Sequence, residues 1–407
     1  MKRFLVYLAI ALVATIPGLW LRLTGRHPGA LIEAAIFGGA LLAAGFILSW
    51  GAEAAEGRVS QGLLLAGLAL VTVLPEFAVD IYYAFRAGQA PGSDYIHYAA
   101  ANMTGANRLL IGFAWPLVVF LHWYKTRKTA VELLPSNRIE LFFLALASAY
   151  AFVILFKGRI DLIDFGLLLA IFGAYLWRLA LNRKPKLIEE EDDDDEEPGP
   201  AAALESLSPQ GQWAWTAGLT ALAGAVILIG AEPFAESMIA SGRILGIDEF
   251  LLIQWVAPLT GEAPELVLAV LFVFAARASS GLIALISDKI NQWTLLVGAL
   301  PVAMSIGAGS IIALPLSARQ HEEFFLTAAQ SLFAISLLLG LRLSVVGATL
   351  LIGLFTLQLG LAFAFQQDPP REIVALTILG WVYIALAIAS SSIHAARLLR
   401  LRTGRAI

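Results

Sequence analysis

Two short motifs place a proline directly before a glutamate inside long apolar stretches. They are LPEF at 74–77, within ALVTVLPEFAVDIYYAF, and APEL at 263–266, within VAPLTGEAPELVLAVLF. A proline inside a helix cannot donate a backbone N–H and releases the carbonyl four residues earlier. In lipid, such a carbonyl is tolerated only where protein or a water-filled cavity covers it. Freed carbonyls beside carboxylates make an oxygen-rich environment that suits Ca²⁺, Na⁺ or a proton.

The acids around each motif share helical faces. Glu76 and Asp80 are four residues apart, and Glu262 and Glu265 are three apart, so each pair projects from one face of a helix. Desolvation and like charge disfavour four neighbouring ionised carboxylates unless cations or protons bind to them. Protons and metal ions would therefore compete for the same carboxyl groups.

The next apolar stretch in each half carries a polar interruption, AANMTGANRLLIG from Ala100 and LISDKINQWTLLVG from Leu285. Ionisable residues within a membrane span are costly to bury and are functional by default. The amides have helix capping and helix–helix hydrogen bonding as alternative roles. The predicted ion-binding residues are Glu76, Glu265, Glu262, Asp80, Asn107, Asn291, Thr72 and Thr260, with Glu76 and Glu265 as the metal-binding carboxylates. The predicted modulators are Lys289, Asp288, Arg108, Asn102 and Gln292.

Two of these modulators are basic. Arg108 and Lys289 fall inside apolar stretches, where a charged side chain needs a partner. We expect both to pair with the acids of the site. An alternative for Lys289 is that its ammonium group acts as a tethered cation in the place of a metal or sodium ion. For Asp80, an ion pair or a place in the wall of the ion path is as natural as ion binding.

The elements that must position these residues are transmembrane helices. Of the 407 residues 59% are hydrophobic and 14% are charged, and the mean hydropathy is +0.79. Soluble domains carry about 25% charged residues. Because about 20 apolar residues cross a bilayer, the sequence predicts an all-α polytopic membrane protein with about 12 transmembrane helices. They lie near 3–22, 29–50, 60–85, 94–121, 139–156, 162–181, 212–240, 248–276, 280–306, 323–341, 343–364 and 373–396.

A charged stretch divides the chain, since every residue from 189 to 197 is acidic. Such blocks repel themselves and stay solvated, which favours a linker. The predicted domains are an extra N-terminal transmembrane helix (1–28), a first repeat (29–181), an acidic cytoplasmic linker (182–211), a second repeat (212–365), and an extra C-terminal transmembrane helix with a basic tail (366–407). We expect the first apolar segment to be a retained helix rather than a cleaved signal peptide.

The distribution of Lys and Arg predicts the orientation. If the N-terminus is cytoplasmic, the cytoplasmic segments carry about twice as many of these residues as the outer loops. Both termini and the linker would then be cytoplasmic. Spans two to six and seven to eleven form two units of five helices, and an odd number of spans makes the units insert in opposite orientations. Inverted repeats with matching polar interruptions indicate a secondary transporter with its site near the midplane.

The motifs resemble those of the sodium/calcium exchanger membrane region of the calcium/cation antiporter superfamily. The first pair reads VTVLPE (71–76) and GAN (105–107), and the second reads LTGEAPE (259–265) and SDKINQ (287–292). The resemblance covers spans two to eleven and implies an all-α exchanger bundle working by alternating access. It also implies that Glu76 and Glu265 are the central ion-binding carboxylates, completed by Asn107 and residues near Asn291, and that the protein lies in a prokaryotic cytoplasmic membrane.

The sequence also departs from the family's motifs. Val73 replaces a serine, Gly261 and Glu262 replace a Thr-Ser pair, and Lys289 stands within the second G-S-N motif. An added acid and an added base are equally consistent with Ca²⁺ exchange and with a site tuned for protons.

The leading hypothesis is a secondary active antiporter that exchanges Ca²⁺ or another cation for Na⁺ or H⁺. The alternatives are an Na⁺/H⁺ antiporter, a channel, and a membrane-embedded scaffold or enzyme with structural ion pairs. The chain has no cysteine, its five histidines lack metal-ligand spacing, and no phosphate-binding loop is present. We therefore expect a transporter rather than an enzyme, no cofactor, and the bilayer and inorganic cations rather than nucleic acid as partners, with the oligomeric state open.

Overall fold

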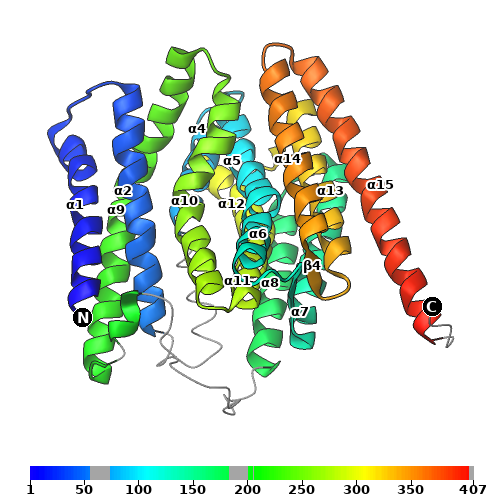
Figure 1. Cartoon of the computed structure of the whole chain (residues 1–407). Coiled ribbons are helices and arrows are strands. Elements are labelled where there is room, and N and C mark those ends of the chain that lie inside the picture. Colours follow the sequence, from blue (N-terminus) through cyan, green and yellow to red (C-terminus); the bar gives the residue numbers. More distant parts are fainter. Residues whose placement is uncertain (56–73, 183–199, 205, 403–407) are drawn as a thin grey trace.

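The computed structural model describes residues 1–55, 74–182, 200–204 and 206–402 (Figure 1). The helices before the acidic linker are α1 (Lys2–Thr24), α2 (Ala30–Ala55), α4 (Leu74–Gln89), α5 (Tyr95–Leu109), α6 (Trp115–Thr126), α7 (Arg138–Lys157) and α8 (Leu162–Asn182). Those after it are α9 (Pro209–Leu245), α10 (Glu249–Phe274), α11 (Ala278–Asn291), α12 (Val297–Ala308), α13 (Ala318–Leu338), α14 (Val345–Phe365) and α15 (Pro369–Arg402). Single π-helical turns, η1 (Leu110–Ala114) and η4 (Gln292–Leu296), join α5 to α6 and α11 to α12.

The predicted fold class is confirmed. Within the described residues, 10 helices are long and apolar enough to cross a membrane, counting α5–α6 and α11–α12 as one span each. The remaining two predicted spans correspond to α4, which is described from Leu74, and to α13, whose apolar character is interrupted by buried Glu and Gln side chains. The protein is an integral membrane protein.

The two halves run in opposite directions through the bundle (Figure 1). Helices α2, α4, α5–α6, α7 and α8 form the first unit, and α9, α10, α11–α12, α13 and α14 form the second. Because α2 and α9 are antiparallel neighbours, each later helix also runs opposite to its counterpart. Both chain ends lie at the same end of the bundle, as an even number of spans requires.

Two short antiparallel strand pairs connect the loops of one unit to those of the other. Strand β1 (Ala130–Glu132), after α6, pairs with β4 (Arg342–Ser344), which precedes α14. Strand β2 (Arg159–Ile160), before α8, pairs with β3 (Leu314–Pro315), after α12. Each pair therefore joins the loop after the third span of one unit to the loop before the fifth span of the other. The two pairs are related by swapping the units, as an inverted repeat predicts.

The helices form three groups (Figure 1). Helices α1, α2 and α9 pack together on one flank, and α13, α14 and α15 lie on the other. Between them α4, α5, α10, α11 and α12 form the centre, where both Pro-Glu motifs are found. The polar interruptions of the sequence thus lie where the two units meet.

Candidate cation-binding site

Helices α4 and α10 approach each other closely at the two Pro-Glu motifs. A β-carbon built on Gly45 of α2 would lie 2.9 Å from Cγ of Pro264 and 3.7 Å from Cγ of Pro75. A β-carbon on Gly261 would lie 3.2 Å from Cβ of Glu76. The prolines therefore meet at one small residue of α2, and Gly261 lets the Glu76 backbone lie against α10.

One of the carbonyls released by the prolines of α10 is covered by protein. Pro258 and Pro264 lie inside α10, and Pro258 removes the hydrogen bond to the Gln254 carbonyl. A β-carbon on Gly105 would lie 1.9 Å from that carbonyl oxygen, so only glycine allows α5 to pack here. The carbonyl released by Pro75 belongs to Val71, which is outside the described residues.

The amide of Gln292 is the centre of the acid cluster. Its Nε2 atom donates hydrogen bonds to Oε2 of Glu76 at 3.1 Å, to Oδ2 of Asp288 at 3.4 Å, and to Oε1 of Glu262. Gln292 is fully buried and is the first residue of the π-turn η4. One amide nitrogen thus lies where three carboxyl groups from α4, α10 and α11 converge.

The carboxyl groups also contact one another. Glu262 lies beside both Glu76 and Asp288, and Glu265 lies close enough to act electrostatically on Glu76 and Asp288. Glu76 and Glu262 are buried, and one carboxyl oxygen of each has no hydrogen-bond partner among the described residues. Carboxyl groups packed this closely favour a bound proton or cation, because ionised carboxylates repel each other.

Asp80 lies one helical turn beyond Glu76 and away from Gln292. It is completely buried and lies next to Asn102 of α5. Its charge acts on Glu76, with which it shares a face of α4. Asp80 and Asn102 thus form a second layer of polar groups beside the cluster.

Within the described residues Lys289 forms no ion pair with the acids, so the expected direct pairing is wrong. Its charge still acts on Glu76, Glu262 and Asp288 from a longer distance. Its Nζ donates to Oδ1 of Asn107 at 2.6 Å and to the Asn107 backbone oxygen at 3.1 Å. The ammonium group also lies 4.7 Å from the centre of the Trp293 ring. Because Lys289 is on α11 and Asn107 is on α5, the contact joins the corresponding spans of the two repeats.

Arg108 does not pair with these acids either. Its guanidinium forms an ion pair with Glu323 of α13, and both side chains are buried. Gln254 of α10 supports this pair through a hydrogen bond from Nε2 to Oε2 of Glu323 at 2.8 Å. Glu323 is not among the predicted site residues because it lies at the start of the predicted span 323–341, where an acid is not costly. The signal was Gln330, seven residues later on the same helical face.

The remaining candidate residues lie around the cluster. Asn291, the last residue of α11, is buried. The Thr260 hydroxyl donates to the Ala257 backbone oxygen at 2.7 Å, and its methyl group faces α2 near Gly38. Thr72 lies outside the described residues.

Both polar interruptions are followed by a π-turn within three residues of their asparagine. Turn η1 begins three residues after Asn107, and η4 begins directly after Asn291. A π-turn inserts one residue into an α-helix and is found mostly at functional sites. The π-turn η4 begins at Gln292, the residue whose amide binds the carboxyl groups.

The cluster differs from a preformed metal centre. In the described part of the chain, no three or more His, Asp or Glu side chains converge as metal ligands. Within the same residues, no Lys, Arg or His nitrogen lies within 4.0 Å of the carboxyl oxygens of Glu76, Glu262, Glu265 or Asp288. In the described residues this cluster therefore lacks a direct ion pair, and the nearest fixed positive charge that acts on it is the Lys289 ammonium group.

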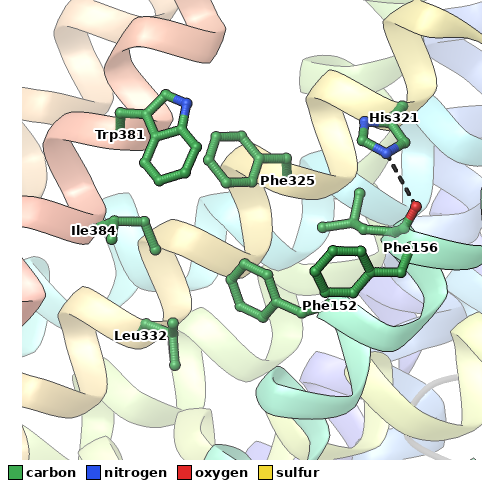
Figure 2. A pocket seen from close by; sticks show the side chains of 8 residues that line it. Phe152, Phe156, His321, Phe325, Leu332, Trp381 and Ile384 are labelled. Carbon is green, nitrogen blue, oxygen red and sulfur yellow. Dashed lines mark hydrogen bonds between the residues drawn. The ribbon is translucent and has the colours of Figure 1, made fainter.

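A separate cavity has a different chemistry. It measures about 460 Å³ and lies between α7, α13 and α15, where its lining is apolar (Figure 2). The His321 ring points at the Leu155 backbone carbonyl, and its Nε2 atom lies 3.1 Å from the carbonyl oxygen. The cavity has no carboxylate in its lining, so it lacks the ligands that a hard cation needs. The lining residues are Phe152, Leu155, Phe156, His321, Phe325, Leu332, Trp381 and Ile384.

The fold is shared with solved exchangers. The structure resembles the crystal structure of the H⁺/Ca²⁺ exchanger CAX, with a TM-score of 0.83 and 39% sequence identity over 99% of each chain. It has the same fold as native YfkE (TM-score 0.63, 13% identity, 89% of this chain and 99% of that one). The same holds for the sodium-calcium exchanger NCX_Mj soaked with Na⁺ and Sr²⁺ (TM-score 0.51, 18% identity, 81% and 99%).

The sequence itself matches one family in two blocks. A model of the family described as sodium/calcium exchanger protein matches residues 29–181 and 215–365. No curated protein matches the chain. The matched family and the solved relatives are ion exchangers rather than enzymes. With both halves of the bundle matched and one solved exchanger 39% identical along almost the whole chain, this protein belongs to the sodium/calcium exchanger family.

Proposed function

We propose that this protein exchanges Ca²⁺ for protons across the membrane at the cluster of Glu76, Glu262, Glu265 and Asp288. The observation that carries the proposal is the convergence of three of these carboxyl groups on the Gln292 amide, with no basic side chain bound to them in the described residues. A buried cluster of this charge needs protons or cations, and each excludes the other. Mutually exclusive occupancy is what couples two ions in an antiporter.

The ligand chemistry favours a divalent cation. Ca²⁺ takes six to eight oxygen ligands, and carboxylates supply both the oxygens and the charge. The 39% identity to an H⁺/Ca²⁺ exchanger supports the same pair of ions here. The likeness to the sodium-calcium exchanger NCX_Mj, at 18% identity, supports the fold alone.

Gln292 has two ways to face the site. In this structure its Nε2 atom donates to the carboxyl groups, and its Oε1 atom is buried without a partner. When Ca²⁺ replaces protons, the carboxylates turn their oxygens to the ion, and Oε1 of Gln292 becomes a further ligand of the kind Ca²⁺ prefers. Glu76 and Glu265 are the central ligands in this proposal, with Glu262 and Asp288 completing the charge.

Alternating access would come from movement between the repeats. Helices α2 and α9 form an antiparallel pair that packs on α4 and α10 beside the cluster. We place the repeats at 29–181 and 212–365, joined by a cytoplasmic linker at 182–211 and flanked by 1–28 and 366–407. Movement of the α2–α9 pair across the Pro-Glu motifs would expose the cluster to one side at a time. The Lys and Arg distribution supports cytoplasmic termini. The membrane in this proposal is a prokaryotic cytoplasmic membrane, as the family resemblance implies.

Flux measurements in liposomes test the proposal. Liposomes that contain the full chain should take up ⁴⁵Ca²⁺ when the proton concentration is higher inside than outside. A pH-sensitive dye should record protons leaving the liposomes at the same time. Glu76→Gln and Glu265→Gln should abolish the flux, whereas Glu132→Gln, in β1 outside the spans, should keep it. Uptake of ²²Na⁺ driven by the pH gradient without Ca²⁺ uptake would favour Na⁺/H⁺ exchange. If neither ion shows a coupled flux, the result would favour a membrane-embedded scaffold or enzyme. Flux that dissipates a gradient without driving the other ion would indicate a channel.

A further inference from the structure

A second buried polar cluster lies beside the cation site, between α5, α10, α13 and α15. Its core is the ion pair of Arg108 and Glu323. Arg108 also donates from Nε to the Thr104 backbone oxygen at 3.3 Å, and its guanidinium lies 5.0 Å from the centre of the Trp255 ring. Gln254 connects the pair to the Thr104 hydroxyl at 3.4 Å. We call this group, with the residues added below, the α13 cluster.

Glu322 lies beside this pair without a partner of its own. Only 3% of the residue is exposed, and in the part of the chain that the structure describes neither carboxyl oxygen has a hydrogen-bond partner. Deeper along α13, Gln330 is fully buried and both of its amide atoms also lack a partner. The Tyr383 hydroxyl of α15 lies beside Gln330 but forms no hydrogen bond with it. Buried polar groups in native proteins are satisfied, and groups like these indicate bound water, an ion or a proton.

The α13 cluster extends to one end of the bundle. Arg319, one turn before Glu322 and Glu323, forms ion pairs with Asp248 at 2.7 Å and with Glu372 at 3.0 Å. The side chains of Arg319 and Asp248 are 18% and 19% exposed, so the polar path begins at the protein surface. From there it continues through Glu322 to the Arg108–Glu323 pair.

The charges in the α13 cluster do not balance. The groups that act on Glu322 are Arg319 and Glu323 on its own helix, Arg108 on α5 and Glu372 on α15. Together with Asp248, the N-cap of α10, the α13 cluster contains two guanidinium groups and four carboxyl groups, so negative charge is in excess when all of them are ionised. An excess of buried negative charge is unstable without a bound cation or proton. Glu322 is the carboxyl group with no ion pair, so it is the one that takes the proton.

We propose that Glu322 is a proton-binding site, separate from the cation site, that exchanges protons with water at the Arg319 end of the bundle. The step is the transfer of one proton from water at that end to the Glu322 carboxylate, which becomes a neutral carboxylic acid. Arg108 remains paired with Glu323 throughout. Because Arg108 follows Asn107 on α5, and Asn107 binds Lys289, a change of charge at Glu322 is transmitted to the helix that borders the cation site.

The role of Glu322 in coupling rests on the proposed Ca²⁺/H⁺ exchange, but its proton binding does not. The first experiment is therefore pH-difference infrared spectroscopy of the purified full chain, which detects the carbonyl stretch of protonated carboxyl groups. Glu322→Gln should remove one such band, and in the wild type this band should titrate with pH in the absence of Ca²⁺ as well. Glu322→Asp, which keeps a carboxyl group, should shift the band instead. Glu140→Gln, a buried acid near the opposite end of the bundle, serves as the matched control.

The second experiment separates ion binding from proton coupling in liposomes. Glu322→Gln should retain the exchange of ⁴⁵Ca²⁺ for Ca²⁺ at equal pH, which moves no net proton. The same variant should lose about tenfold or more of the Ca²⁺ uptake driven by a pH gradient, as expected when a proton-transfer group is removed.

Three results would overturn the inference. In the first, the infrared spectrum of Glu322→Gln equals that of the wild type. In the second, both kinds of Ca²⁺ flux are unchanged. In the third, both fluxes fall together in a folded, monodisperse variant and Glu322→Asp restores neither, which would assign Glu322 a packing role. A wild-type chain without Ca²⁺ flux would contradict the proposed function, while the infrared band would still decide the proton site.

Discussion

Gly261 of α10 lies directly against Glu76 of α4, and a β-carbon at Gly261 would stand 3.2 Å from Cβ of the glutamate. This contact joins the two Pro-Glu motifs, which the sequence separates by almost half its length. It also explains why a glycine stands where related motifs have a hydroxyl residue, since a larger side chain would move Glu76 away from Gln292.

Gly261→Ala should weaken Ca²⁺ binding by displacing Glu76. We expect a loss of about tenfold in affinity and about 1–3 kcal/mol in stability, as for other overpacked sites. Isothermal titration calorimetry and thermal unfolding in detergent measure the two effects. Gly39→Ala is the matched control, because nothing lies within 4 Å of a β-carbon at that position of α2. Equal effects of the two substitutions would contradict the role of the contact.

Gln292→Glu should make Ca²⁺ binding more sensitive to protons. The substitution replaces the amide at the convergence of three carboxyl groups with a fourth carboxyl group. Added like charge favours protonation, so half-maximal Ca²⁺ binding should require a higher pH than in the wild type. Gln292→Ala removes the amide without adding charge and should weaken binding without this shift. Titrations with Ca²⁺ over a range of pH values distinguish the two, and an unchanged pH dependence in Gln292→Glu would exclude the assignment.

Lys289→Met should create a place for a monovalent cation. The Lys289 ammonium group donates hydrogen bonds to the side-chain and backbone oxygens of Asn107, and such oxygens are the kind of ligands that bind Na⁺. Without it, Na⁺ should compete with Ca²⁺ or add to it, so that ²²Na⁺ binds to the variant and not to the wild type. Lys125→Met is the control, because Lys125 contacts the Phe274 carbonyl at an exposed position. If ²²Na⁺ binds to neither Lys289→Met nor the wild type, the ammonium group is not a substitute cation.

Removing one partner of the Arg108–Glu323 pair should be strongly destabilising. Arg108→Met leaves a buried carboxylate without its cation, and Glu323→Gln leaves a buried guanidinium, so each should cost about 3–5 kcal/mol. The double variant should lose less than the sum of the two single losses, since neither charge remains. Thermal unfolding of the four proteins in one detergent gives the double-mutant cycle. Additive losses would show that the two side chains do not interact.

Ca²⁺ binding should release protons. The carboxyl groups must lose their protons to become ligands, so lowering the pH should weaken Ca²⁺ binding and raising it should strengthen binding. Calorimetric titrations in two buffers with different ionisation enthalpies report the number of protons released. Glu262→Gln should release fewer protons than the wild type, because Glu262 contacts two other carboxyl groups. A binding enthalpy that does not depend on the buffer would contradict proton competition.

The sequence by itself determined the membrane spans, the inverted order of the repeats and the two Pro-Glu motifs. These follow from local properties: the length of an apolar stretch, the missing N–H of proline and the cost of a buried acid. Glu76, Glu262 and Asp288 were identified for the same reason, and the structure places their carboxyl groups together. Their roles as ion ligands stay a prediction.

Only the tertiary structure decided which polar groups pair with one another. Gln292 contacts Glu76 across 216 positions of the chain, Lys289 contacts Asn107 across 182, and Arg108 contacts Glu323 across 215. A buried charge must find a partner, but many partners satisfy that requirement equally well in the sequence. The choice depends on which helix faces meet, and close contacts such as that at Gly261 bring particular faces together.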